Sequence, residues 1–250
     1  MRAFFYTFFI LILFNACIDK NSGATFLKSN KKSNTSDTKK NTILRSDSSV
    51  YEKLFVKNGL VNICEMDSDI RVVLMYNSDK NFLGKSFYKG LNQCYLNCDA
   101  ATKLNNAQKL LKQQFPFYNL IVFDATRPAH IQKLMWDSLK LQPIVKYDYL
   151  ARPDELSLHN YGAAVDVSII NENGVLLDMG TPYDFFGDLA RPSMENEFYT
   201  SGALSKEAYC NRLLLRKIMI QSGFYPITSE WWHFNACNKA YAAANYKLIE

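Results

Sequence analysis

Residues 51–250 predict one domain that mixes α-helices with β-strands. In some segments apolar residues recur every three or four positions, as on the buried face of a helix, whereas other segments are short, apolar and β-prone. The two kinds of segment follow one another along the chain without an internal repeat. With 250 residues, of which 48% are hydrophobic, the chain is long enough to bury one sizeable core.

The first clear helix and strand are predicted between residues 99 and 124. Asp99 is a candidate N-cap, and the segment that follows it has apolar residues at helical spacing up to residue 115. These residues are Leu104, Ala107, Leu110, Leu111 and Phe115. The next apolar segment, NLIVFD at residues 119–124, predicts a strand.

A second helix is predicted from Pro128 onward, since proline suits the first turn of a helix. Its apolar positions again lie three or four residues apart, at Ile131, Leu134, Met135 and Leu139. Arg127 therefore stands where a strand ends and a helix begins.

Two further elements follow. Residues 163–170, AAVDVSII, alternate small or β-branched residues with Asp166 and Ser168, which predicts a half-buried strand. A third helix is expected over about residues 205–222, ending at Gly223. Its apolar face holds Tyr209, Leu213, Leu214 and Ile218.

The N-terminus has the layout of a secretory signal over residues 1–16. Arg2 precedes an apolar run from Ala3 to Phe14, which is too short to span a bilayer comfortably, because a spanning helix needs about 20 residues. The Ala16–Cys17 junction resembles a bacterial lipoprotein signal, which implies a lipid on Cys17. The alternative is an ordinary cleaved signal in which Cys17 has no role.

Residues 17–50 predict a flexible tether, because they are rich in Ser, Asn, Thr and Lys and have few large apolar side chains. We therefore expect an exported domain in the periplasm or cell envelope that contacts the membrane only through its N-terminal lipid.

The net charge of +5 lies outside the predicted domain. Arg2 and residues 17–50 hold the basic excess, whereas residues 51–250 carry 21 basic and 21 acidic residues. Nucleic-acid binding requires a basic face on the domain itself, so that class of function is excluded.

Two of the three histidines stand near carboxylates. Asp166 follows His159 by seven residues, and Glu230 precedes His233 by three, whereas His130 has no such partner and suits a structural or surface role. Two imidazoles and one carboxylate form a common catalytic zinc set that leaves a position for water. A further carboxylate can take the proton of that water. Spacing alone leaves open the alternative of two unrelated buried histidines.

Four ordered segments, FDATRP, SLHNYGAAVD, MGTPYD and SEWWHF, resemble the zinc-dependent D-alanyl-D-alanine dipeptidase family. The resemblance runs from about Tyr76 to Phe234. It implies an α+β fold in which helices flank an antiparallel sheet. It also implies one zinc ion per chain, bound by His159, Asp166 and His233.

The resemblance also implies roles for other residues. Glu230 would be the general base, Arg127 would stabilise the oxyanion, and Asp184 would bind the free ammonium of a dipeptide. Ser157 would hydrogen-bond the substrate carboxylate, and Tyr76 would line the pocket. The alternatives are a salt bridge at the helix start for Arg127, and local capping or packing for Ser157 and Tyr76.

The chain departs from the family pattern at Tyr183, where the family usually has Phe. The ring fills the same volume, so the departure leaves the implied function in place. Trp231 and Trp232 are expected to form walls of the site and part of the core.

The implied activity is zinc-dependent hydrolysis of the D-alanyl-D-alanine dipeptide to two D-Ala. One alternative is a zinc D,D-carboxypeptidase or peptidoglycan endopeptidase that acts on longer wall peptides; export favours it, whereas MGTPYD favours the dipeptidase. Another is a non-catalytic wall-binding lipoprotein. Glu230 and Arg127 argue against that last reading, because neither is needed merely to hold a metal.

Five cysteines follow Cys17, and in an oxidising compartment one or two disulfides would leave an odd thiol. The sequence leaves their pairing open. They are Cys64, Cys94, Cys98, Cys210 and Cys237.

Overall fold

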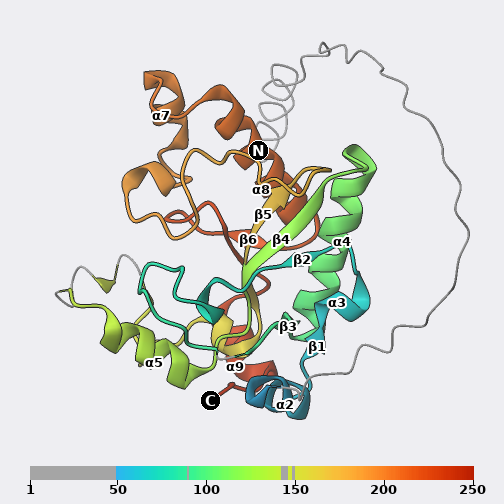
Figure 1. The fold of residues 1–250 in the computed structure, drawn as a ribbon, viewed down its shortest axis with the longest axis vertical. Helices are drawn as coiled ribbons and strands as arrows, with labels where there is room; N and C mark the ends of the chain where they lie inside the picture. Colours follow the sequence, from blue (N-terminus) through green and yellow to red (C-terminus); the bar gives the residue numbers. More distant parts are fainter. Residues whose placement is uncertain (1–48, 89, 142–145, 148–149) are drawn as a thin grey trace, which may run out of the picture. The chain divides into compact units, whose positions relative to one another are not determined.

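A computed structural model of the chain describes residues 49–250, except residues 89, 142–145 and 148–149 (Figure 1). The predicted signal, the lipid site at Cys17 and almost all of the tether lie outside the described residues. Within the described part, no helix is both long enough and apolar enough to cross a membrane.

The main sheet has five strands in the order β2-β4-β5-β7-β6. The expected antiparallel pairing is found in β4–β5, β5–β7 and β6–β7, whereas β2 pairs with β4 in parallel. A parallel pair requires a long crossover, and here the connection contains a full helix, α4. The strands are β2 (Arg71–Val72), β4 (Asn119–Asp124), β5 (Ala164–Ile170), β6 (Tyr225–Pro226) and β7 (His233–Asn235).

Shorter elements precede α4. A two-stranded antiparallel sheet joins β1 to β3, and Ser49 caps α2 by accepting a hydrogen bond from the backbone N–H of Glu52. These elements are α2 (Val50–Lys57), β1 (Val61–Asn62), α3 (Ile63–Met66), η1 (Met75–Asn77) and β3 (Tyr95–Leu96).

Helix α4 (Cys98–Gln114) is the first predicted helix, and it packs against β4 and α8. Its N-cap is Asn97 rather than Asp99, because β3 ends at Leu96 and the chain turns at once into the helix. Asp99 lies in the first turn instead, where a carboxylate still interacts favourably with the helix dipole.

Helix α5 (Ala129–Ser138) begins after Pro128, which is the N-cap rather than part of the first turn. Its buried face is narrower than predicted. Ile131 and Met135 are buried, but Leu134 is half-exposed and Leu139 lies beyond the helix.

Strand β5 is buried along its whole length, whereas the sequence predicted a half-buried strand. It lies between β4 and β7 in the middle of the sheet, so both of its edges are paired, and elements packed on the sheet cover both of its faces. Asp166 and Ser168 are therefore buried as fully as their apolar neighbours.

Helix α8 (Lys206–Gln221) matches the third predicted helix closely. Ser205 caps it, and Gly223, with φ +95°, follows its end. Figure 1 shows α2, α5 and α9 at one end of β4 and α7 with α8 at the other. The remaining elements are η2 (Leu158–Tyr161), η3 (Asp188–Ala190), α7 (Glu195–Ser201) and α9 (Lys239–Asn245).

Candidate active site

His159, Asp166 and His233 come from three adjoining elements. Asp166 on β5 lies directly opposite His233 on β7 in the antiparallel register. His159 is on η2, and Gly162 ends that helix in the left-handed conformation with φ +63°. The chain therefore folds back, so that His159 lies next to Asp166.

The ligand atoms of these three residues face one another. His159 Nε2 lies 3.2 Å from His233 Nδ1 and 3.4 Å from Asp166 Oδ1, and His233 Nδ1 lies 3.0 Å from the same oxygen. Donor atoms at about 2.0–2.1 Å from a tetrahedral zinc ion are roughly 3.3 Å apart. The three side chains can thus hold a metal ion with little movement.

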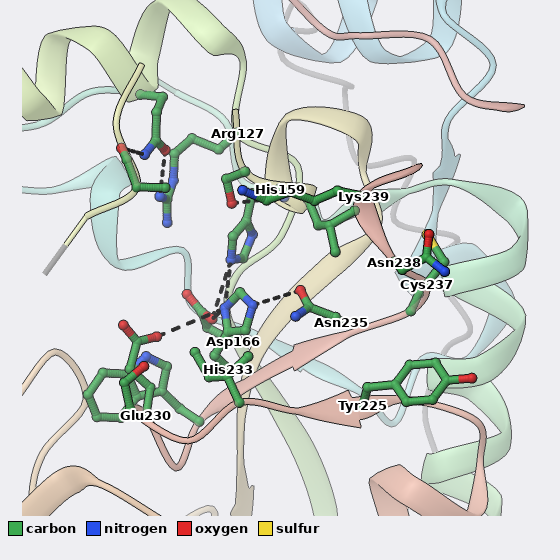
Figure 2. A pocket seen from close by; sticks show the side chains of 18 of the residues that line it. Arg127, His159, Asp166, Tyr225, Glu230, His233, Asn235, Cys237, Asn238 and Lys239 are labelled. Atoms are coloured by element: carbon green, nitrogen blue, oxygen red, sulfur yellow. Dashed lines mark hydrogen bonds and ion pairs between the residues drawn. The ribbon is translucent and has the colours of Figure 1, made fainter. Parts of the chain in front are cut away.

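The other polar atom of each side chain is engaged elsewhere. His159 Nδ1 lies 2.5 Å from the carbonyl oxygen of Ala125, and His233 Nε2 lies 2.9 Å from Asn235 Oδ1. If both nitrogens donate, Nε2 of His159 and Nδ1 of His233 are left as lone-pair donors to a metal. Figure 2 shows both rings turned toward Asp166.

The charges of the cluster are coupled. Burial alone would raise the pKa of Asp166, but its interactions with His159 and His233 lower that pKa well below 3.8. Burial opposes protonation of His233, but the hydrogen bond with Asp166, the negative charges of Asp166 and Glu230 and the contact with Asn235 together outweigh it and raise the pKa of His233 above 6.5. Asp166 is therefore ionised and ready to bind a cation.

Glu230 lies beside the ligand cluster but outside it. It precedes β7, and its Oε2 is 4.0 Å from His233 Nδ1. Burial raises the pKa of this carboxyl from 4.5 to about 7. Figure 2 shows the Glu230 carboxylate directed toward Asp166 and His233. A carboxylate in this position can take or give a proton near neutral pH.

Arg127 is fixed by an ion pair. Its Nε and Nη2 donate to Asp124 Oδ2 at 2.9 and 2.5 Å, and its Nη1 donates to Gln132 Oε1 at 2.9 Å. The predicted alternative, a salt bridge at the helix start, is therefore present. These contacts use three of the five guanidinium N–H groups. Arg127 also lines the cavity described below, so the ion pair holds its positively charged guanidinium at the site.

Asp184 follows Tyr183 with φ +58°, a conformation rarely adopted by residues other than glycine. Its carboxylate accepts hydrogen bonds from the Tyr76 hydroxyl at 3.0 and 3.2 Å. Burial, together with the charge of Asp166, raises the pKa of Asp184 well above 3.8. A cation next to this carboxylate would restore its ionised form.

The loop that carries Tyr183 and Asp184 is anchored by buried Arg212. The Arg212 guanidinium donates to the carbonyl oxygens of Met179 at 2.7 Å and Leu189 at 2.9 Å, on either side of the loop. The sequence reasoning did not identify this role, since nothing in the spacing of Arg212 points to carbonyl groups more than twenty residues away.

Ser157 caps η2, and its hydroxyl accepts a hydrogen bond from the His159 backbone N–H at 3.3 Å. This is the capping alternative, although Ser157 also lines the cavity.

His130 lies apart from this cluster in its contacts and stacks on the Tyr51 ring. The cysteines Cys64, Cys94, Cys98 and Cys237 are free.

The sequence did not point to several partners of the site residues. Among them are Asn235, which contacts His233, Asp124, which pairs with Arg127, and the hydroxyl of Tyr183, which donates to Asp166 Oδ2 at 3.0 Å. A signal existed for Asn235, because residues two apart on a strand share a face. At Tyr183 only the volume of the ring was considered, and the hydrogen bond that its hydroxyl can donate was overlooked.

One cavity of about 1120 Å³ unites the site. Trp232 also lines it, whereas buried Trp231 donates its indole N–H to Thr181 Oγ1. The lining includes every site residue predicted within residues 51–250, namely Tyr76, Arg127, Ser157, His159, Asp166, Asp184, Glu230 and His233.

Comparison with known proteins places the same region in one group. A family described as D-ala-D-ala dipeptidase matches residues 56–249. A D-alanyl-D-alanine dipeptidase of Escherichia coli is 32% identical over 190 residues, which cover 76% of this chain and 89% of the relative. Proteins of the same name from Synechocystis and Enterococcus faecalis are 27% and 26% identical, covering 62% and 74% of this chain and 74% and 95% of the relatives.

Proposed function

The chain belongs to the D-Ala-D-Ala dipeptidase family of metallopeptidases, and on this basis we propose that it hydrolyses the D-alanyl-D-alanine dipeptide with one zinc ion. The proposed ligands are His159, Asp166 and His233. The observation that carries the proposal is the mutual distance of 3.0–3.4 Å between their ligand atoms.

The donor set fits zinc. Two neutral imidazoles and one carboxylate are typical of catalytic zinc sites, and the site must keep one position open for water. Zinc bound there would supply a Lewis acid for the scissile carbonyl and lower the pKa of a water molecule to about 7.

Glu230 and Arg127 supply the remaining chemistry. Glu230 accepts the proton of the attacking water and passes it to the leaving amine, a role that suits a carboxylate beside the metal ligands but outside their cluster. The Arg127 guanidinium, held by Asp124 and Gln132, stabilises the negative charge that develops on the carbonyl oxygen.

Asp184 accounts for the preference for a free dipeptide. The substrate ammonium pairs with its half-buried carboxylate, which Tyr76 orients through its hydroxyl. A blocked or longer peptide would leave this carboxylate desolvated and unpaired, which costs on the order of a few kcal/mol. Ser157 is proposed to contact the substrate carboxylate.

We further propose that the domain works outside the cytoplasm. The signal-like residues 1–16 and the polar residues 17–50 support export and a lipid anchor at Cys17 in the cell envelope. Incorporation of labelled fatty acid into the wild-type chain, and its loss in Cys17→Ala, would test the anchor.

A second candidate is cleavage of longer wall peptides by a zinc D,D-carboxypeptidase or endopeptidase. The cavity favours it, since about 1120 Å³ slightly exceeds the roughly 300–1,000 Å³ typical of small-molecule sites and is more than a dipeptide fills. The position of Asp184 favours the dipeptide.

Release of D-Ala by the purified protein distinguishes the candidates. The substrates are D-Ala-D-Ala and an N-acylated peptide that ends in D-Ala-D-Ala, each with and without a chelator. Chelator-sensitive release from the free dipeptide alone is the expected result. Release chiefly from the blocked peptide would contradict the dipeptidase, and no release from either would favour a non-catalytic wall-binding protein.

A further inference from the structure

The hydroxyl of Tyr183 contacts a metal-ligand candidate directly. It lies 3.0 Å from Asp166 Oδ2, the oxygen that does not face the two histidines. The Tyr183 ring is held in place by its neighbours, with centroid distances of 5.0 Å to Phe123 and 5.4 Å to Trp232. The packed ring thus holds the hydroxyl next to Asp166.

This contact determines how Asp166 presents its oxygens. Without a partner, a carboxylate can rotate and offer either or both oxygens to a cation. Here Oδ1 lies 3.0 Å from His233 Nδ1, while Oδ2 accepts the Tyr183 hydrogen bond. We propose that Tyr183 is a positioning residue, whose hydroxyl holds Asp166 so that Oδ1 alone faces the metal.

The same hydroxyl lies close to the substrate-binding side of the site. Tyr183 Oη is 3.5 Å from Tyr76 Oη, and Tyr76 donates to Asp184 at 3.0 Å. The candidate metal ligand and the proposed ammonium anchor therefore each accept a hydrogen bond from one of two neighbouring tyrosines. The proposal rests on the zinc site of the proposed function but not on its substrate.

The test is the zinc affinity of Tyr183→Phe, measured by competition with a chromogenic chelator. Removal of a hydrogen bond to a metal ligand typically weakens metal binding by about 10- to 100-fold, and we expect a loss in this range. The substitution keeps the ring but leaves buried Asp166 Oδ2 without this donor, so the melting temperature of the metal-free protein should fall as well.

Tyr76→Phe is the matched control. This substitution removes the neighbouring Tyr76 hydroxyl but leaves the Tyr183–Asp166 contact, so the zinc affinity of the variant should equal that of the wild type. Wild-type affinity in Tyr183→Phe would overturn the proposal. Equal losses of zinc affinity in both variants would overturn it too, because they indicate a general packing effect. Normal zinc binding by the wild-type protein without hydrolysis of the dipeptide would instead contradict only the proposed function.

Discussion

At the scale of single residues, the proposed metal ligand Asp166 and the proposed general base Glu230 lie in different surroundings. Asp166 is almost completely buried and its oxygen faces two imidazoles, whereas Glu230 is 24% exposed and 4.0 Å from the nearest ligand nitrogen. Two carboxylates in such different surroundings are suited to different tasks.

Glu230→Ala should therefore keep zinc and lose hydrolysis. General acid–base catalysis contributes about 10²- to 10⁴-fold, and kcat should fall by that factor. Metal analysis and D-Ala release measured on the same sample check both parts. His233→Ala is the comparison, since it should lose zinc as well as activity. A metal-free Glu230→Ala protein would show that Glu230 is a ligand.

Asp184→Asn tests recognition of the substrate ammonium. Asparagine keeps the shape of the side chain but removes its charge, so kcat/KM for the free dipeptide should fall by at least about tenfold, the effect of roughly 1.4 kcal/mol. Hydrolysis of an N-acylated substrate should change much less.

The control for this variant is Asp188→Asn, a change at an exposed carboxylate at the start of η3 that pairs with Arg191. It should leave both activities unchanged. Equal losses on the two substrates in Asp184→Asn would remove Asp184 as the ammonium anchor.

At the scale of elements, the turn at Gly162 connects two ligand-bearing segments, η2 and β5. A Cβ at this position would lie 2.9 Å from Thr126 Oγ1 and 3.0 Å from the backbone nitrogen of Asn97. The positive φ adds backbone strain for any other residue.

Gly162→Ala should lower the free energy of unfolding of the metal-free protein by about 1–3 kcal/mol and weaken zinc binding, because His159 moves with the turn. Urea denaturation and chelator competition measure the two effects. Gly174→Ala is the matched control, since Gly174 also has positive φ but would meet no atom within 4 Å. If both variants lose equal stability and bind zinc alike, the close contacts at Gly162 have no role.

Much of the fold at this scale was predictable. Helices α4, α5 and α8 and strands β4 and β5 are long enough to show a period in the sequence, and they lie close to the predicted positions. Strands β1, β2, β3 and β6 have only two residues each, too few to show any period. The parallel β2–β4 pair was missed for the same reason.

The residues of the site were predictable, but most of their hydrogen-bond partners were not. The resemblance named the residues around the metal, and the structure places all of them at one cavity. Their partners depend on tertiary packing. The contact of Asn235 could be predicted from the alternation of side chains along a strand. The hydrogen bonds of Arg212 to Met179 and Leu189 could not, because they join segments that are distant in sequence.

At the scale of the whole molecule, stability should depend on the protonation of Glu230. Its pKa is about 7 in the folded protein against an ordinary value of 4.5. Between these values the folded metal-free protein holds a proton that the unfolded chain releases, so this contribution to stability is full below pH 4.5 and is lost as the pH rises through 7.

The free energy of unfolding of the metal-free protein should therefore decrease from pH 5 to pH 7 more steeply than that of Glu230→Gln. Denaturation with urea at several pH values gives both curves. Parallel curves would show that Glu230 titrates near its ordinary value. With zinc bound, the positive charge lowers the pKa of Glu230, so activity should reach its plateau at or below pH 7.

The most direct test of the central claim is a zinc titration. Zinc is added stepwise to the metal-free protein, and D-Ala release from D-Ala-D-Ala is measured at each step. Activity should rise in proportion to added zinc and stop rising at one zinc per chain. Full activity in the metal-free protein, or a plateau at a different stoichiometry, would contradict a single zinc ion bound by His159, Asp166 and His233.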